Sequence, residues 1–434
     1  MREMKDSGIE WIGQVPNNWK LKKGKYLFKQ HNNRGNLKCL QLLSPSQKFG
    51  VIPQTLLEEL TTQNVVKVSE KANLNDFKTV HVGDFCISLR SFQGGFEYSH
   101  YEGVVSPAYQ IFSAIGDNLC DGYYRYLFKD KSFIDKMNSY TMTLRDGKNI
   151  AFDDFGNTYI PVPPKSEQEK IANFLDSQCS EIDAISADIQ KEIEMLEQYK
   201  RSVITEAVTK GLNPDAEMKD SGIEWIGKIP LNWKLEKGKY LFRQRNSKGN
   251  NISLQLLSPS QKYGVIPQTL LEKLTTQNVV KTNERADLGN FKTIHKGDFC
   301  ISLRSFQGGF EYSEYEGVVS PAYQVFYKVE PLYNNYYRYL FKENSFIKKM
   351  NSFTMTLRDG KNIAFSDFGD TYIPVPPLDE QEKIATFLNK KSSEIDSLVA
   401  EKKQQLEVLD SYKKSLIYEY VTGKKEVPLW KSNT

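Results

Sequence analysis

The stretch Gly83–Ser99, GDFCISLRSFQGGFEYS, occurs a second time, letter for letter, at Gly297–Ser313. The similarity extends outward from this run in both directions, so that residues 4–210 correspond to residues 218–423. A period of this length is that of a whole domain with its connector, far above the roughly 20–50 residues of a solenoid repeat. The chain is therefore a tandem duplication, which predicts two similar ligands or one ligand with two-fold symmetry.

The composition is that of an ordinary soluble protein, with 434 residues that are 39% hydrophobic and 26% charged. The net charge of +4 permits basic patches but does not by itself indicate a nucleic-acid binder. No apolar run approaches the ~18–20 residues that span a bilayer, and the polar N-terminus MREMKDSGIEW lacks a signal peptide's apolar core. Five scattered cysteines without a C-x-x-C pair favour reduced thiols. We therefore expect a cytoplasmic protein that does not contact membranes.

Each copy begins with a part, residues 1–160 and 218–373, that mixes short strand and helix patterns. KTVHVGDFCISL (Lys78–Leu89) reads as a strand, a Gly-Asp turn and a second strand. YYRYLFKDKSFIDKM (Tyr123–Met137) carries aromatic and aliphatic residues at helical spacing. Interleaved elements without a long run of one type predict two similar globular domains of the α+β class.

A proline-rich hinge ends each globular part, as IPVPPKSEQEKIA at Ile160–Ala172 and IPVPPLDEQEKIA at Ile373–Ala385. The prolines forbid helix continuation there. Ser166 and Asp379, each followed three residues later by a glutamate, are helix-start signals. The hinges therefore predict that a helix begins directly after each globular part.

The two predicted helices cover residues 166–209 and 379–422 and would each be ~65 Å long at 1.5 Å per residue. Such helices are too long to pack inside one globular domain. Residues 161–217 and 374–434 are therefore expected to form two helical spacers.

Apolar residues recur every seven positions in both helices, which indicates a coiled coil. The obvious partner of each helix is the helix of the other copy, with a surface left over for a separate subunit. Lys402 interrupts the row in the second helix. The main row comprises Leu175, Ile182, Ile189, Leu196 and Val203 in the first helix and Leu388, Ile395, Leu409 and Leu416 in the second; Ile185, Tyr199, Leu398 and Tyr412 are assigned to the adjoining row.

No catalytic motif is found. The chain has no P-loop, no G-x-S-x-G and no H-E-x-x-H, and its four histidines lack metal-ligand spacing. Pro214-Asp215 followed by Glu217-Met218-Lys219 spells a metal-dependent nuclease motif, but such carboxylates normally come from separate strands. Here they are adjacent, in the linker between copies. We therefore expect a chain that is not an enzyme and binds neither metal nor cofactor.

Three repeated turns carry side chains suited to DNA. Arginine can pair with guanine and glutamine with adenine, while lysine and arginine on turns suit phosphates. Turns are polar in any protein, and arginines often pair with a neighbouring acid, so an ordinary surface role fits the same residues. The candidates are Arg90, Ser91 and Gln93 (Arg304, Ser305 and Gln307 in the second copy), Arg145, Lys148 and Asn149 (Arg358, Lys361 and Asn362), and Lys48 (Lys262).

Three motifs, each present twice and in the same order, carry a family resemblance. D-S-G-I-E-W-I-G-x-x-P-x-x-W opens each copy, and I-P-V-P-P-x-x-E-Q-E-K-I-A-x-F-L follows each globular part. A helix ending in Tyr-Lys-Arg/Lys-Ser-Val/Leu-Ile closes each copy. Over essentially the whole chain, the sequence resembles the DNA-specificity subunit of Type I restriction-modification systems. The motifs lie at Asp6–Trp19, Ile160–Leu175 and Tyr199–Ile204, and at Asp220–Trp233, Ile373–Leu388 and Tyr412–Ile417.

The resemblance implies two target-recognition domains, each reading one half of a split target in double-stranded DNA. It implies that the long helices pair antiparallel, with internal pseudo-two-fold symmetry, and dock two modification subunits. Those subunits would carry S-adenosylmethionine and the adenine-N6 methyltransferase site. Restriction subunits would add ATP- and Mg-dependent translocation and cleavage.

The near-identity of the two globular parts departs from the family pattern, in which the two recognition domains differ. Like domains around a two-fold axis should read like half-sites, which predicts an interrupted palindrome. Two segments differ between the copies: residues 31–39 against 245–253, and residues 111–122 against 325–335. We expect both to be peripheral, because the loops with arginine and glutamine are unchanged.

Two alternatives to the DNA hypothesis remain. The first is a scaffold that is not an enzyme, with two binding modules for a protein or carbohydrate ligand. The second is a stand-alone enzyme that acts on DNA without partners.

Overall fold

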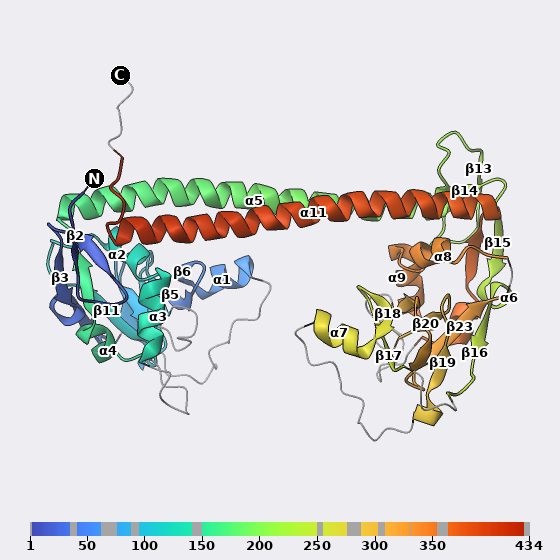
Figure 1. Cartoon of the computed structure of the whole chain (residues 1–434), viewed down its shortest axis with the longest axis horizontal. Helices are drawn as coiled ribbons and strands as arrows, with labels where there is room; N and C mark the ends of the chain where they lie inside the picture. The colour runs from blue at the N-terminus through green and yellow to red at the C-terminus, as the bar shows by residue number, and fades with distance from the viewer. Residues whose placement is uncertain are drawn as a thin grey trace. The chain divides into compact units, whose positions relative to one another are not determined.

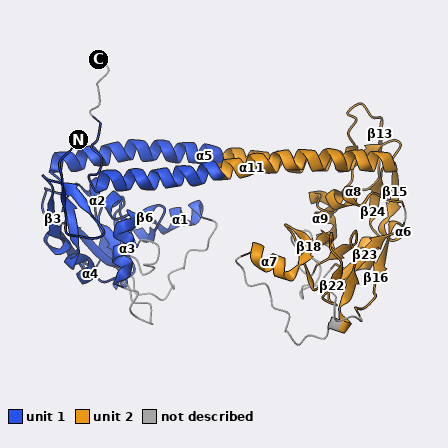
Figure 2. Cartoon of the chain, viewed as in Figure 1, with its two compact units in different colours: residues 1–189, 404–434 blue, residues 190–403 orange. Residues whose placement is uncertain are grey.

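The computed structural model describes residues 2–34, 41–61, 76–87, 95–140, 150–249, 255–275, 288–302, 309–329, 331–353 and 363–428. The chain forms two compact units (Figure 2). Unit 1 contains residues 1–189 and 404–434, and unit 2 contains residues 190–403. Both boundaries fall inside the two long helices, α5 (Lys165–Lys210) and α11 (Leu378–Val421) (Figure 1). Each unit therefore combines one globular part with a helix segment from each copy.

The globular part of unit 1 is built on two four-stranded sheets, which confirms the α+β class. One antiparallel sheet has the order β4-β11-β8-β9, and the other has the order β6-β5-β10-β7 with β5 and β10 parallel. The strands are β1 (Met4–Asp6), β2 (Gln14–Pro16), β3 (Lys20–Lys23), β4 (Phe28–His31), β5 (Gln41–Ser46), β6 (Gly50–Pro53), β7 (Lys78–Val80), β8 (Phe85–Ile87), β9 (Phe96–Tyr98), β10 (Gly103–Val105), β11 (Gln110–Ala114) and β12 (Tyr159–Val162). The short helices are η1 (Gly24–Tyr26), α1 (Gln54–Leu60), α2 (Asp121–Leu127), α3 (Lys131–Ser139) and α4 (Phe152–Asn157).

The globular part of unit 2 repeats this plan, and its four-stranded sheet β16-β23-β20-β21 corresponds to β4-β11-β8-β9. Its strands are β13 (Met218–Asp220), β14 (Lys228–Pro230), β15 (Lys234–Lys237), β16 (Phe242–Arg245), β17 (Leu257–Ser260), β18 (Gly264–Pro267), β19 (Lys292–Ile294), β20 (Phe299–Ile301), β21 (Phe310–Tyr312), β22 (Gly317–Val319), β23 (Gln324–Lys328) and β24 (Tyr372–Val375). Its short helices are α6 (Gly238–Leu241), α7 (Gln268–Leu274), η4 (Leu288–Asn290), α8 (Asn334–Leu340), α9 (Asn344–Ser352) and α10 (Phe365–Gly369).

Aromatic side chains fill the main core of each globular part. Phe28, 1% exposed, lies edge-on to Phe112 at 5.6 Å and to Tyr124 at 5.2 Å between ring centroids. Phe242 makes the same contacts in unit 2. Edge-to-face pairs add to the stabilisation from burial alone. Large rings therefore let strands of only three to five residues form a stable core.

The helix segments within each unit run antiparallel. In unit 1, Phe174 contacts Tyr420, and further along α5 Asp183 pairs with Lys413 at 2.6 Å. In unit 2, Glu192 pairs with Lys402 and Lys200 with Asp396. Rising numbers along α5 thus meet falling numbers along α11. No helix in the part of the chain that the structure describes is long and apolar enough to cross a membrane.

The main heptad row lies on the buried face of the helices, but our assignment of the adjoining row is wrong. Ile185, Tyr199, Leu398 and Tyr412 are 43–55% exposed. Burial instead alternates by four and three residues, as in a coiled-coil seam. The true second row includes Ser186, Lys200 and Lys413, and these polar members conceal it in the sequence. Its buried members are Cys179, Ile193, Ser392 and Val399, whereas in the main row Leu175, Ile182, Leu388, Ile395 and Leu416 are buried and Ile189, Leu196, Val203 and Leu409 are half-buried.

Candidate nucleic-acid interface

Most of the predicted contact residues lie outside the part of the chain that the structure describes. Lys48 and Lys262 are described, and so are the strands and helices that flank the other predicted segments. The roles of the remaining candidates stay predictions. Those outside the described residues are Arg90, Ser91, Gln93, Arg145, Lys148, Asn149, Arg304, Ser305, Gln307, Arg358, Lys361 and Asn362.

The two predicted base- and phosphate-contacting segments of unit 1, residues 88–94 and 141–149, have their ends joined by one side chain. Gln110 lies opposite Ile87, the last residue before segment 88–94, in the register of β11 and β8. Its amide Nε2 donates to the main-chain oxygen of Ile150 at 2.9 Å, and its Oε1 accepts from the main-chain N–H of Phe152 at 2.8 Å. The end of segment 141–149 is therefore held at the same sheet edge as the start of segment 88–94.

The same arrangement recurs in unit 2. Gln324 lies opposite Ile301, donates to the main-chain oxygen of Ile363 at 3.1 Å and accepts from Phe365 at 2.7 Å. Sequence reasoning missed both glutamines. The available signal was a polar residue heading an apolar strand in both copies, in VSPAYQIF and VSPAYQVF. A glutamine offers both a donor and an acceptor, so it can tie together two main-chain groups.

Lys48 lies away from these segments, on the turn between β5 and β6. The turn packs on the far end of β9, where Val51 bridges to Ser99. The Lys48 ammonium lies over the Phe49 ring at 5.1 Å, and Lys262 lies over Tyr263 at 5.0 Å. The structure therefore does not bring Lys48 to the sheet edge that carries the ends of the other predicted segments.

A groove of about 690 Å³ in unit 1 starts at the Lys48 turn and is lined by residues of α2, α3 and α11. Most of its cations are already paired with acids. Lys129 pairs with Glu97 and Lys413 with Asp183, each at 2.6 Å. The pairing leaves a weakly positive groove in which Lys48 is stacked on a ring. The cations that line it are Lys48, Arg125, Lys129, Lys131, Lys413 and Lys414.

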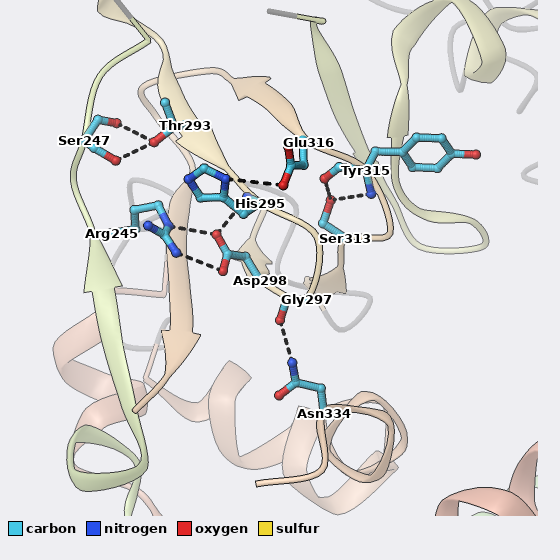
Figure 3. A network of polar contacts seen from close by, with 10 residues as sticks. All are labelled: Arg245, Ser247, Thr293, His295, Gly297, Asp298, Ser313, Tyr315, Glu316 and Asn334. Carbon is cyan, nitrogen blue, oxygen red and sulfur yellow. Dashed lines mark hydrogen bonds and ion pairs between the residues drawn. The ribbon is translucent and has the colours of Figure 1, made fainter. Parts of the chain in front are cut away.

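A polar network around the buried Asp298 and Asp84 carboxylates accommodates one difference between the copies. In unit 2, Arg245 donates two hydrogen bonds to Asp298, at 2.8 and 3.2 Å (Figure 3). In unit 1 the equivalent His31 lies 3.3 Å from Asp84. The histidine and the arginine both lie against the same buried carboxylate, which is 4% exposed in each copy. The exchange is therefore accommodated inside the domain.

A second difference lies beside this network. Asn334 of α8 donates to the main-chain oxygen of Gly297 at 3.0 Å (Figure 3), where unit 1 has Asp121. Burial raises the pKa of Asp121, and the nearby Asp84 charge raises it further. Unit 1 thus holds two carboxyl groups where unit 2 holds one carboxyl group and an amide.

Two copies of an α+β domain, each completed by an antiparallel pair of helix segments, define a protein with an internal duplication. No cluster of three or more metal-binding side chains occurs among the described residues. The family model for the Type I restriction modification DNA specificity domain matches residues 16–195 and again residues 229–408. The chain belongs to this family.

Relatives in Methanocaldococcus jannaschii are similar to part of the chain. The inferred type I restriction enzyme MjaX specificity subunit is 27% identical over 61% of this chain. The type I restriction enzyme MjaVIII specificity subunit is 27% identical over 62% of it. The matched regions span 59% and 63% of the length of these relatives.

Solved structures share the fold. A structure described as showing complex assembly and conformational transition of the type I R-M system matches with a TM-score of 0.67 at 12% identity, over 95% of this chain and 99% of that chain. The HsdS subunit from Thermoanaerobacter tengcongensis matches with a TM-score of 0.50 at 13% identity, over 95% of this chain and 98% of its own. At these identities the likeness concerns the fold alone.

Proposed function

We propose that the chain is the DNA-binding specificity subunit of a Type I restriction-modification complex. It reads a two-part target in double-stranded DNA and directs adenine-N6 methylation and restriction by partner subunits. The observation that carries the proposal is the double family match, once over each globular part and its following helix. The chain supplies recognition, while S-adenosylmethionine, ATP and Mg are bound by the cytoplasmic partners.

DNA binding is tested with the full chain, its modification subunits and duplex DNA at a series of salt concentrations. Binding should weaken steeply with salt, because phosphate contacts release counterions. Salt-independent binding to a protein or carbohydrate with no affinity for duplex DNA would favour the two-module scaffold instead. Methylation or cleavage of DNA by the chain alone would favour a stand-alone enzyme.

The target is proposed to be an interrupted palindrome, and strand register supports this. In β11, Gln110 lies opposite Ile87 and Phe112 lies opposite Phe85. The variable segment after Phe112 therefore lies at the end where the chain enters β8, whereas segment 88–94 follows the exit of β8. Segment 31–39 leaves β4 at the exit end, but its first residue, His31, is directed at Asp84. Sequencing of methylated adenines in the host should show reverse-complement half-sites, and unrelated half-sites would refute the palindrome.

The modification subunits are proposed to dock on exposed apolar residues of the helix pair. In unit 1, Ile185, Val408 and Tyr412 are 43%, 61% and 52% exposed. Their equivalents in unit 2 are Leu398, Met195 and Tyr199, at 47%, 55% and 55%. Large apolar side chains exposed together mark interaction surfaces. One such patch in each unit fits two modification subunits in the complex.

This docking proposal is tested by co-purification with the modification subunit. Val408→Asp and Met195→Asp together should abolish the complex, and each alone should leave one modification subunit bound. Glu181→Asp, a mild change on an exposed part of α5, serves as the control. Retention of both subunits by the double variant would refute docking at these patches.

A further inference from the structure

We propose that the ion pair between the buried Glu97 and the partly exposed Lys129, with its copy Glu311–Lys342, is a positioning device for DNA contact. It holds the Gln47–Phe49 turn against β9, the strand that follows segment 88–94. The inference rests on the proposed function, because DNA is the ligand that these segments are expected to meet.

Glu97 lies where it can fix the exit of segment 88–94. It is the central residue of β9, which begins two residues after that segment, and it lies opposite Cys86 of β8. Only 2% of Glu97 is exposed, and its Oε2 accepts a hydrogen bond from the Lys129 ammonium at 2.6 Å. A short, charge-assisted bond of this kind is stronger and more directional than a neutral one.

Lys129 joins this strand to the turn that carries Lys48. Its ammonium also donates to the main-chain oxygen of Gln47, at 3.3 Å. The backbone supports the same contact, because Gly50 has a φ of +74° and a Cβ added there would lie 2.6 Å from the main-chain oxygen of Tyr98. The Lys129 ammonium group therefore bridges the Glu97 carboxylate of β9 and the main-chain carbonyl of Gln47 in the Lys48 turn.

The second copy has retained the pair while its surroundings changed. Lys342 donates to Glu311 at 2.6 Å, Glu311 is 2% exposed, and Gly264 has a φ of +73°. Near Lys129, the groove residues His100 and Lys131 of unit 1 are Glu314 and Asn344 in unit 2. These exchanges alter the charge of the groove and leave the ion pair unaltered.

Stability alone does not account for a carboxylate buried at this place. Desolvation of the buried glutamate offsets much of its attraction to the partly exposed lysine, and apolar side chains of similar volume stabilise a fold at least as well. Oε2 of Glu311 has no hydrogen-bond partner among the described residues, so the site is only partly satisfied. A directional tie between the Lys48 turn and β9 is a function that apolar packing does not supply.

The pair also makes the tie sensitive to pH. Burial raises the pKa of Glu97, opposed by Lys129, and raises the pKa of Glu311 to about 7, opposed by Lys342. Among the described residues, the buried Cys86 thiol also faces Glu97, and burial raises the pKa of this thiol well above its ordinary value. Acid therefore protonates the glutamate and weakens the bond to the lysine.

The first test is amide hydrogen exchange of the full chain with Glu97→Gln and Glu311→Gln together. Exchange in the turns at residues 47–50 and 261–264 should rise about tenfold, in line with the loss of a charge-assisted hydrogen bond. Exchange in β4 and β11 should not change, which shows that the domain is folded. Unchanged exchange in both turns would refute the positioning role.

Two further variants sharpen this test. Lys129→Arg with Lys342→Arg keeps a cation that can reach both oxygens, so the turns should remain protected. Glu167→Gln serves as the matched control, because Glu167 pairs with Arg2 at 2.5 Å, lies at the start of α5 and does not line the groove at the Lys48 turn. The proposal would also be overturned if the arginine variant or the Glu167→Gln control raised exchange in the turns as much as the double glutamine variant does.

The second test uses a mixed-sequence 30-base-pair duplex at low salt, with binding measured between pH 6 and 8. The wild-type chain should bind about tenfold more tightly at pH 8 than at pH 6, and the double glutamine variant should bind weakly at both. Equal binding by wild type and variant at pH 8 would refute positioning for DNA. Absence of binding by the wild type would refute the proposed function, while the exchange result still decides the structural tie.

Discussion

The hydroxyl of Tyr123 donates a hydrogen bond of 2.7 Å to the main-chain oxygen of Val421, a residue 298 positions further along the chain. Tyr336 makes the equivalent bond of 2.8 Å to Val208. The last carbonyl groups of a helix have no partner within the helix, and here a buried tyrosine supplies one. Each globular part is therefore closed by the helix end of the other copy.

Removal of either tyrosine hydroxyl should destabilise its own unit. Tyr123→Phe leaves a buried carbonyl oxygen unsatisfied, which should lower the free energy of unfolding by about 1–2 kcal/mol. Urea denaturation checks this, with Tyr26→Phe as the control because Tyr26 is 66% exposed. Equal stability of the two variants would contradict the role of the bond.

The corrected register of the helix seam predicts opposite outcomes for two isoleucines three residues apart. Ile182 is 6% exposed and Ile185 is 43% exposed. Ile182→Ala should cost about 2–5 kcal/mol by leaving a cavity, whereas Ile185→Ala should cost under about 0.5 kcal/mol. Thermal denaturation of both variants decides the register, and similar losses would restore the earlier assignment.

Two glycines with positive φ separate backbone strain from crowding. Gly50 has a φ of +74° and faces a main-chain oxygen 2.6 Å from the added Cβ position, while Gly116 has a φ of +70° and faces open space. Gly116→Ala should cost about 1–2 kcal/mol from its left-handed conformation alone. Gly50→Ala should cost clearly more, because the turn must also move off Tyr98. Urea denaturation of the two variants measures the difference.

Stability should also depend on pH through Glu311. Burial raises its pKa from an ordinary 4.5 to about 7, so the folded state holds this proton more tightly than the unfolded chain. The resulting stabilisation is complete below pH 4.5 and is lost as the pH rises through 7. Urea denaturation between pH 4.5 and 8 should show the wild type losing stability relative to Glu311→Gln. A constant difference would contradict the raised pKa.

The equivalent turn lysines of the two copies, Lys48 and Lys262, should contribute to DNA affinity by contacting phosphates. Lys48→Ala and Lys262→Ala should each make the plot of log affinity against log salt less steep by about 0.9. Fluorescence anisotropy with a duplex at several salt concentrations measures this slope. Lys383→Ala is the control, since Lys383 is exposed and pairs with Asp379 within α11. A slope equally reduced in the control would show a general charge effect.

The sequence identified the long helices to within one residue at each end, because the proline-rich hinges and acidic caps are local signals. The second seam row escaped detection, since Lys200 and Lys413 lie in it and pair with acids of the facing helix. The sequence also did not predict that the end of each long helix packs on the globular part of the other copy. Nothing local to α5 indicates whether its end contacts the first globular part or the second.

At the candidate site, too, local features were predicted from the sequence and long-range contacts were not. Strand and turn patterns located the repeated segments, and their strands lie where the patterns placed them. The side chain that joins two of these segments, Gln110, acts through hydrogen bonds to Ile150 and Phe152, some 40 residues away. Lys129 reaches Gln47 over 82 residues. Such contacts depend on the tertiary fold, so periodicity and turn chemistry carry no signal for them.

The interleaved composition of the two units has a consequence for biosynthesis. Unit 2 is one continuous stretch, residues 190–403, whereas unit 1 needs residues 404–434 to complete the core around Tyr123. At about 5–20 residues per second, a ribosome takes on the order of 10–40 s to make the intervening chain. Unit 1 is thus the first to be synthesised and the last to be completed. Its apolar face stays exposed to solvent until residues 404–434 have been made. A nascent chain that stalls after unit 2 would leave that face uncovered and prone to aggregation.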